Sequence, residues 1–324
     1  MNDFSFNALT PDLILDAIES LEIYPTSGLL ALNSYENRVY QFAAEDGRRY
    51  VVKFYRPNRW TDEQILEEHE FALAASQGEV PVVAPLVIAG NSLHCHAGYR
   101  FTLFPSVGGR QFELDNLDHL EILGRYLGRL HGLAGSKPFQ YRPTLSTEQF
   151  LFKAKETLLK SQLVPSHLHT PFVTILEQVI NLASQQYQVD STIRLHGDCH
   201  AGNLLWSGEQ LMLVDLDDCR QGPAIQDLWM MLNGDRNEQR LQLDTLLMAY
   251  EEFNSFDSKE LALIEPLRAM RMINYMAWLA ERWQDPAFER NFSWFATDKY
   301  WEQQILALKE QLAALSEPSL SLFP

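Results

Sequence analysis

The feature that most constrains this chain is a pair of polar segments on either side of a short hairpin. Residues 196–203 read HGDCHAGN and residues 214–218 read VDLDD. The apolar runs 204–206 and 211–214 lie between them, and residues 207–210 (SGEQ) join the two runs with a turn signal. Because a hairpin returns the chain to its starting point, we expect Asn203 and Asp215 to lie close together.

The residue types at these positions suit phosphoryl transfer from a nucleotide. Asp198 would orient the attacking hydroxyl, while the amide oxygen of Asn203 and the carboxylate of Asp215 would hold magnesium against the phosphates. Asp217 is a further acidic candidate. A lone His-Gly-Asp is typical of an ordinary polar turn, but all three groups placed around a hairpin favour a catalytic interpretation.

Length and charge narrow the class of protein. The 324 residues are 46% hydrophobic, which is long for one core and natural for two lobes. The 43 acidic and 26 basic residues give a net charge of -17, which argues against nucleic acid and anionic membranes as partners. Such a surface would accept a basic substrate, but we favour the simpler explanation that the negative charge maintains solubility.

No segment reads as an export signal or a membrane span, and three scattered cysteines predict neither a disulfide framework nor a zinc site. We therefore expect a cytoplasmic protein, a monomer or weak dimer. Cys199 directly follows Asp198, and Cys219 directly follows the acidic segment 214–218, so a redox switch is one hypothesis. The simpler expectation is two ordinary reduced thiols.

The amino-terminal third predicts a small lobe rich in strands. A helical pattern covers residues 12–23, strand patterns cover 29–32, 38–43 and 49–55, and a helix is expected over 62–76. Residues 1–106 would form the nucleotide-binding lobe. A strand that runs into Pro and Gly-Gly near 104–109 predicts the crossover to a mostly helical lobe over 107–324.

Lys53 stands alone in an apolar strand. Period-two alternation places it on one face with Val51 and Tyr55, and burying an unpaired ammonium is costly. We therefore expect Lys53 to face a cleft, with nucleotide phosphates and a helix glutamate as partners. Either Glu67 or Glu70 could supply that glutamate, and we favour Glu70 because the apolar residue three positions later would hold its face against the sheet.

The turn over residues 33–37 (NSYEN) lies where many kinases have a glycine-rich phosphate cover, yet it contains no glycine. The Ser34 hydroxyl and the Asn37 amide could act as donors to a nucleotide instead. An ordinary polar hairpin turn is an equally good interpretation.

Three features belong to the carboxy-terminal part. The helix expected over 117–133 contains His131, which we interpret as a core residue. Asp227 begins an apolar run, where it either stabilises a helix amino terminus or braces the catalytic loop. The many aromatic residues in 268–295 are typical of a core and also of a substrate wall.

Several of these segments together resemble the aminoglycoside phosphotransferase and choline kinase superfamily, relatives of the eukaryotic-like protein kinases, from about Leu29 to Trp283. The His-Gly-Asp-x-x-x-x-Asn stretch is specific to that group. A closer resemblance, to a family of bacterial stress response kinases, is carried by that stretch and by the runs 33–42, 51–57, 104–112 and 265–271.

The resemblance implies an α+β, bilobal, protein-kinase-like fold and an ATP- and Mg²⁺-dependent Ser/Thr protein kinase of the cytoplasm. Asp198 becomes the proton acceptor, Asn203 and Asp215 the magnesium ligands, Lys53 the phosphate lysine and Ser34 a nucleotide-loop residue. A small-molecule kinase acting on choline, homoserine or an aminoglycoside is the first alternative. A non-catalytic nucleotide-binding scaffold is the second, and the intact catalytic residues argue against it.

Gly197 replaces the Arg that pairs with an activation-loop phosphate in His-Arg-Asp kinases. After Asp215 the chain reaches Gly222-Pro223 within a few residues, which leaves little room for a regulated loop. We therefore expect activity without phosphorylation of residues 216–226.

Overall fold

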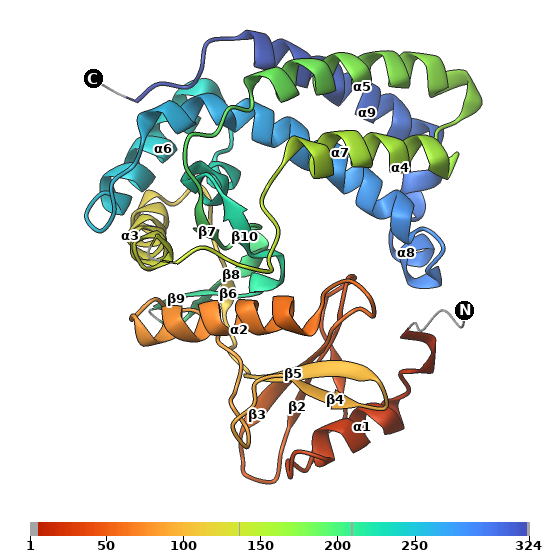
Figure 1. Ribbon diagram of the computed structural model, residues 1–324, viewed down its shortest axis with the longest axis vertical. Coiled ribbons are helices and arrows are strands. Elements are labelled where there is room, and N and C mark those ends of the chain that lie inside the picture. Colours follow the sequence, from red (N-terminus) through yellow and green to blue (C-terminus); the bar gives the residue numbers. More distant parts are fainter. Residues whose placement is uncertain (1–5, 136, 209, 323–324) are drawn as a thin grey trace.

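A five-stranded antiparallel sheet dominates the amino-terminal part of the chain (Figure 1). The computed structural model describes residues 6–135, 137–208 and 210–322. The spatial order of the strands is β1-β2-β3-β5-β4, so that β3 has a neighbour on each side. Their bounds are β1 Leu30–Ala31, β2 Arg38–Ala43, β3 Arg49–Phe54, β4 His94–His96 and β5 Tyr99–Pro105.

Two helices accompany this sheet, and both have capped amino termini. α1 (Pro11–Glu19) begins after the N-cap Thr10 and packs its apolar face on the sheet. α2 (Asp62–Gln77) begins with a capping box, in which Thr61 and Gln64 satisfy each other's backbone groups. In Figure 1, α2 lies between the sheet and the helical remainder of the molecule.

The remainder is mostly helical and encloses one large apolar core. Gly124 and Gly128 on α3 permit a close approach to α6, because a Cβ at either position would lie 2.4 Å from a carbonyl oxygen of that helix. The helix bounds are α3 Leu117–Ala134, α4 Ala154–Ser161, α5 Ser166–Gln186, α6 Arg236–Tyr250, α7 Ile264–Arg282, α8 Pro286–Asn291 and α9 Asp298–Ser316.

Two small sheets lie where the sheet-rich and helical parts meet. β6 (Arg110–Gln111), β8 (Leu204–Ser207) and β9 (Gln210–Leu213) form one, and β7 (Ile193–Leu195) pairs with β10 (Arg220–Gly222) in the other. The expected hairpin is thereby confirmed as β8 and β9, which are antiparallel.

The α+β, bilobal architecture expected from the sequence is confirmed. Two of the expected elements change in extent: the first helix ends at Glu19 rather than near residue 23, and the first strand shrinks to Leu30–Ala31. No helix among the described residues is both long and apolar enough to cross a membrane.

Candidate active site

A cavity of about 250 Å³ lies between the five-stranded sheet and the β8–β9 hairpin. Lys53, Asn203 and Asp215 all line it, although they come from β3 and from the two ends of the hairpin. Crossover residues and the turn over 33–37 complete the wall: Ser34, Asn37, Phe104, Pro105 and Val107.

The expected proximity of Asn203 and Asp215 is confirmed. The Val214 amide donates to the Asn203 carbonyl oxygen at 3.0 Å, which fastens the segment before Asp215 to the segment before β8. Asp215 itself adopts a left-handed backbone conformation with φ 61°, a conformation that side chains other than glycine seldom adopt. Such outliers concentrate at functional sites, where surrounding structure holds them in place.

Lys53 is the centre of a buried charge network. Its Nζ lies 3.0 Å from Asp217, 3.2 Å from Asp215 and 3.3 Å from Glu68. Burial disfavours the ammonium, but these three carboxylates outweigh that effect and raise the pKa of Lys53 well above its ordinary value. Lys53 therefore stays charged and faces the cavity, as its strand position predicted.

The glutamate that pairs with Lys53 is Glu68, so our choice of Glu70 was wrong. Glu68 is 3% exposed and lies on the buried face of α2 with Ile65 and Ala72. Glu70 is two positions along the helix, which turns it to the solvent side, and it pairs there with Lys137 at 2.7 Å.

Glu67, the other candidate, has a different task. Its carboxylate accepts hydrogen bonds from the backbone amides of Gln140, Tyr141 and Arg142 at 2.6 to 2.8 Å. The second oxygen of Glu68 meanwhile binds the Arg142 guanidinium at 2.7 Å. Both glutamates thus tie α2 to a segment of the helical part.

This pairing predicts unequal effects of two neighbouring substitutions. We expect Glu68→Gln to lower kcat/KM for phosphoryl transfer by about 100-fold, because it removes a charge that orients Lys53 and leaves Arg142 buried without its carboxylate. Glu70→Gln is the matched control on the same helix and should change kcat/KM less than about twofold. Equal losses in both variants, measured with a steady-state assay, would contradict the assignment.

Asp198 lies on the loop before β8 and contacts two basic side chains, Arg271 and His200. Arg271, from the middle of α7, forms an ion pair with one carboxylate oxygen, and His200 lies 3.3 Å from the other. Burial opposes ionisation, yet the His200 hydrogen bond and the Arg271 charge outweigh it and hold the pKa of Asp198 well below its usual range. Asp198 is therefore a carboxylate at neutral pH, suited to orient a hydroxyl by accepting its proton in a hydrogen bond.

The side-chain oxygens of Asn203 and Asp215 at the cavity are suitable ligands for a hard divalent cation that also binds the phosphates of a nucleotide. The amide nitrogen of Asn203 donates to the Asp198 carbonyl oxygen at 2.9 Å, so its amide oxygen remains available as an oxygen ligand. The Asp215 side chain is 51% exposed. The described residues contain no group of three or more acidic, His or Cys side chains arranged as a metal site. Two protein oxygens are nevertheless enough for Mg²⁺, which takes its other ligands from phosphates and water.

A buried carboxylate braces the catalytic loop, which decides between our two interpretations of Asp227. Its oxygens accept hydrogen bonds from the His196 and Gly197 amides at 2.7 and 2.8 Å. His131 lies 3.0 Å from the same carboxylate, so its expected core role is confirmed.

The structure gives a steric reason for glycine at position 197, which the sequence comparison with His-Arg-Asp kinases did not reveal. Its φ is +87°, and a Cβ there would lie 2.1 Å from the Asp218 carbonyl oxygen. The catalytic loop and the segment after Asp215 are thus in backbone contact, which no side chain at position 197 allows.

Gly197→Ala should consequently be among the most disruptive small substitutions in the chain. We expect a loss of about 2–4 kcal/mol in the free energy of unfolding, from strain and a forced backbone shift, and a kcat at least tenfold lower. Gly208→Ala, which also has positive φ but meets nothing within 4 Å, serves as a control for the conformational cost alone. Thermal unfolding and a turnover assay on both variants separate the two contributions.

The turn over 33–37 is anchored to the helical part rather than free to cover a ligand. The carboxylate of Glu36 accepts a hydrogen bond from Trp278 Nε1 at 2.6 Å and pairs with Arg282 at 3.0 Å. Asn37 uses its side-chain oxygen to accept from the Arg56 amide at 3.0 Å, and Ser34 donates to the Asn37 carbonyl oxygen. Both residues line the cavity, while their contact with a nucleotide stays a prediction.

The two cysteines near the site are buried, which favours the expectation of inert thiols. Burial raises the pKa of Cys219 to about 12 and that of Cys199 well above its usual value. Both therefore remain protonated and unreactive at neutral pH.

Comparison with known proteins identifies the lineage of this site. Residues 29–264 match the phosphotransferase enzyme family. The chain belongs to the phosphotransferase enzyme family. This phosphotransferase is also 52% identical over 327 residues to "Stress response kinase A" of Salmonella choleraesuis, with 100% of this chain and 99% of that protein covered. The same values hold for "Serine/threonine protein kinase RdoA" of Salmonella typhimurium. The resemblance expected from the sequence runs is confirmed.

A solved structure supports the fold of the phosphotransferase. Amicoumacin kinase hAmiN, in a complex described as containing AMP-PNP, Ca²⁺ and Ami, aligns with a TM-score of 0.70 at 19% identity and covers 97% of this chain and 95% of its own. At that identity the likeness concerns the fold alone.

Proposed function

We propose that this phosphotransferase is an ATP- and Mg²⁺-dependent Ser/Thr protein kinase that acts in a bacterial stress response in the cytoplasm. The observation that carries the proposal is the convergence of Lys53, Asn203 and Asp215 on one cavity, with the ionised Asp198 on the loop beside it. The names of the full-length relatives, which include a stress response kinase and a serine/threonine protein kinase, support the choice of acceptor.

In the proposed reaction the acceptor hydroxyl is held by Asp198 and attacks the γ-phosphorus in line, while the ADP oxygen leaves. Lys53 would orient the phosphates of the nucleotide, and Asn203 and Asp215 would hold the metal, which would neutralise negative charge on the phosphates. The hydroxyl proton ends on Asp198 or on the product phosphate. Catalysis is then mostly positioning, because little covalent chemistry falls to the protein.

Arg271 is a further candidate, for which the sequence predicted no role. Its guanidinium is bound to Asp198 and partly exposed, and we propose that it also contacts the transferring phosphoryl group. Nothing in the sequence near Asp198 points to a residue 73 positions later, so only the fold reveals the pair.

The test is incubation with γ-labelled ATP and Mg²⁺, with one basic and one acidic generic protein as acceptors, beside the Asp198→Asn variant. Label on serine or threonine that disappears in the variant supports the proposal. ATP turnover that rises only with small alcohols or amines would replace it by a small-molecule kinase. Nucleotide binding without any turnover would leave a scaffold.

The small-molecule alternative keeps one specific observation in its favour. The amicoumacin kinase that shares this fold was solved with a small molecule, Ami, beside the nucleotide analogue. A screen of choline, homoserine and aminoglycosides under saturating ATP therefore belongs in the same experiment.

Activity should not require phosphorylation near the active site. Residues 216–226 read LDDCRQGPAIQ and contain no Ser, Thr or Tyr, and β10 within them is paired to β7 and buried. We expect phosphatase-treated protein, with its unmodified mass verified by mass spectrometry, to keep the kcat of untreated protein within about twofold, since no loop needs an added charge to order it. A treated sample without turnover, restored by pre-incubation with ATP, would contradict this expectation.

A further inference from the structure

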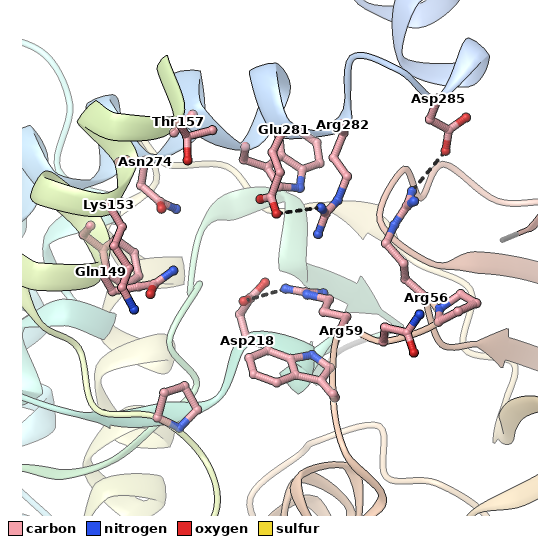
Figure 2. A pocket seen from close by; sticks show the side chains of 18 of the residues that line it. Arg56, Arg59, Gln149, Lys153, Thr157, Asp218, Asn274, Glu281, Arg282 and Asp285 are labelled. Atoms are coloured by element: carbon pink, nitrogen blue, oxygen red, sulfur yellow. Dashed lines mark hydrogen bonds and ion pairs between the residues drawn. The ribbon is translucent and has the colours of Figure 1, made fainter. Parts of the chain in front are cut away.

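A second and larger cavity of about 1010 Å³ opens between α4, α7 and residues 56–60 (Figure 2). We call it the basic cleft, because its charged lining residues are mostly cationic in a chain of net charge -17. The cations that line it are Arg38, Arg56, Arg59, Lys153, Arg220 and Arg282, against the anions Asp218, Glu281 and Asp285.

The basic cleft adjoins the reaction centre. Arg271 of α7 binds Asp198, and Asn274 and Trp278, which follow on the same side of that helix, line the cleft. One helical turn, about 5 Å along the axis, therefore separates the catalytic carboxylate's partner from the cleft wall. Asp218, close behind the proposed metal ligand Asp215, lines the cleft as well.

One wall of the basic cleft is a framework of ion pairs. Arg56 lies 3.0 Å from Glu36 and 3.3 Å from Asp285, and Arg59 lies 2.8 Å from Asp218. These pairs fix the guanidinium groups in place. Since each of these Arg residues already has a carboxylate partner, they shape the local field rather than offer an open site.

The opposite wall carries polar side chains that are free to hydrogen-bond to a ligand. Among the described residues, the Lys153 ammonium makes no ion pair or hydrogen bond, and neither do the side chains of Gln149, Thr157 and Asn274. Figure 2 shows these four side chains gathered on one side of the cleft, facing the ion-paired wall. An ammonium surrounded by amide and hydroxyl groups suits a carboxylate or phosphate, to which charge-assisted hydrogen bonds are strongest.

We propose that the basic cleft binds the acidic flank of the acceptor, with Lys153 as the residue that recognises carboxylate or phosphate groups beside the acceptor hydroxyl. The inference rests on the proposed kinase function and adds the substrate class. It differs from the expectation of a basic substrate, which followed from the net charge of the whole chain. The overall charge describes the average surface, whereas an acceptor bound here meets the charges of the cleft.

The experiment compares two acceptor peptides that contain one serine, flanked either by aspartates or by lysines. We expect the wild-type protein to prefer the aspartate peptide about tenfold in kcat/KM, mainly through KM, and Lys153→Glu to remove or reverse this preference. Lys160→Glu is the matched control, because Lys160 lies on α4, which begins directly after Lys153, is 78% exposed and does not line the cleft. Both variants change the net charge equally.

Each outcome separates the inference from the proposed function. Equal kcat/KM for the two peptides, or equal effects of both variants, would overturn the inference and leave the kinase intact. Absence of label on any peptide would refute the proposed function. A non-reacting copy of the aspartate peptide, with alanine for serine, then tests the cleft by fluorescence anisotropy. If Lys153→Glu weakens peptide binding and Lys160→Glu does not, the anion site is supported. If neither variant changes peptide binding, the anion site is refuted.

Discussion

Asp198→Asn is expected to lower kcat for phosphoryl transfer by about 10³-fold, within the range that a positioned general base contributes. The amide can still accept a hydrogen bond, but it carries no charge with which to hold the hydroxyl proton as the bond to phosphorus forms. Its loss also leaves Arg271 without the carboxylate that it binds.

Nucleotide affinity is the control for this variant. Asp198 does not line the cavity that contains Lys53 and Asp215, so the Kd for a nucleotide analogue should change less than about threefold. Near-normal turnover in the variant would show that another group acts as the base. A collapse of nucleotide binding together with turnover would show that the substitution disturbs the fold rather than the chemistry.

Asp215→Ala should have a comparable effect through a different step. We expect magnesium-dependent nucleotide affinity to fall by about 100-fold, or about 2.7 kcal/mol, because the metal would lose the charged ligand that we propose for it. Lys53 keeps Glu68 and Asp217 as partners, at 3.3 and 3.0 Å, so its charge stays compensated and the fold should persist.

A magnesium titration distinguishes loss of the metal from general damage. In the wild-type protein the affinity for a nucleotide analogue should rise with Mg²⁺ concentration, while in the variant it should stay flat. Without metal, the two proteins should bind the analogue about equally. A variant whose affinity still rises with Mg²⁺ would exclude Asp215 as a principal ligand.

Local signals in the sequence were enough to predict the hairpin and the proximity of Asn203 and Asp215 at its two ends. Turn chemistry between two apolar runs is a short-range property, so the approach of Asn203 to Asp215 followed without knowledge of the fold. Strand alternation likewise placed Lys53 on the face that lines the cavity.

The partners of those residues depend on longer-range packing, and here prediction failed or was silent. Glu70 was chosen from one apolar neighbour, while the complete buried face of α2, with Ile65, Ala72 and Ala75, centres on Glu68. Arg271 and Arg142 reach the site from elements far away in the sequence. No periodicity or spacing encodes such contacts, because they arise only when helices pack.

The anchoring of α2 has a consequence for inhibitor selectivity. Glu67 and Glu68 fasten this helix to residues 140–142, and the Glu68–Arg142 pair is buried. An outward movement of α2 would separate the buried charges of Glu68 and Arg142, at a cost of several kcal/mol. Compounds that bind by displacing the helix equivalent to α2 in other protein kinases should therefore bind this protein weakly. The turn over 33–37 lacks the glycines of the usual phosphate loop. Compounds that contact this turn could therefore distinguish this protein from kinases with a glycine-rich loop.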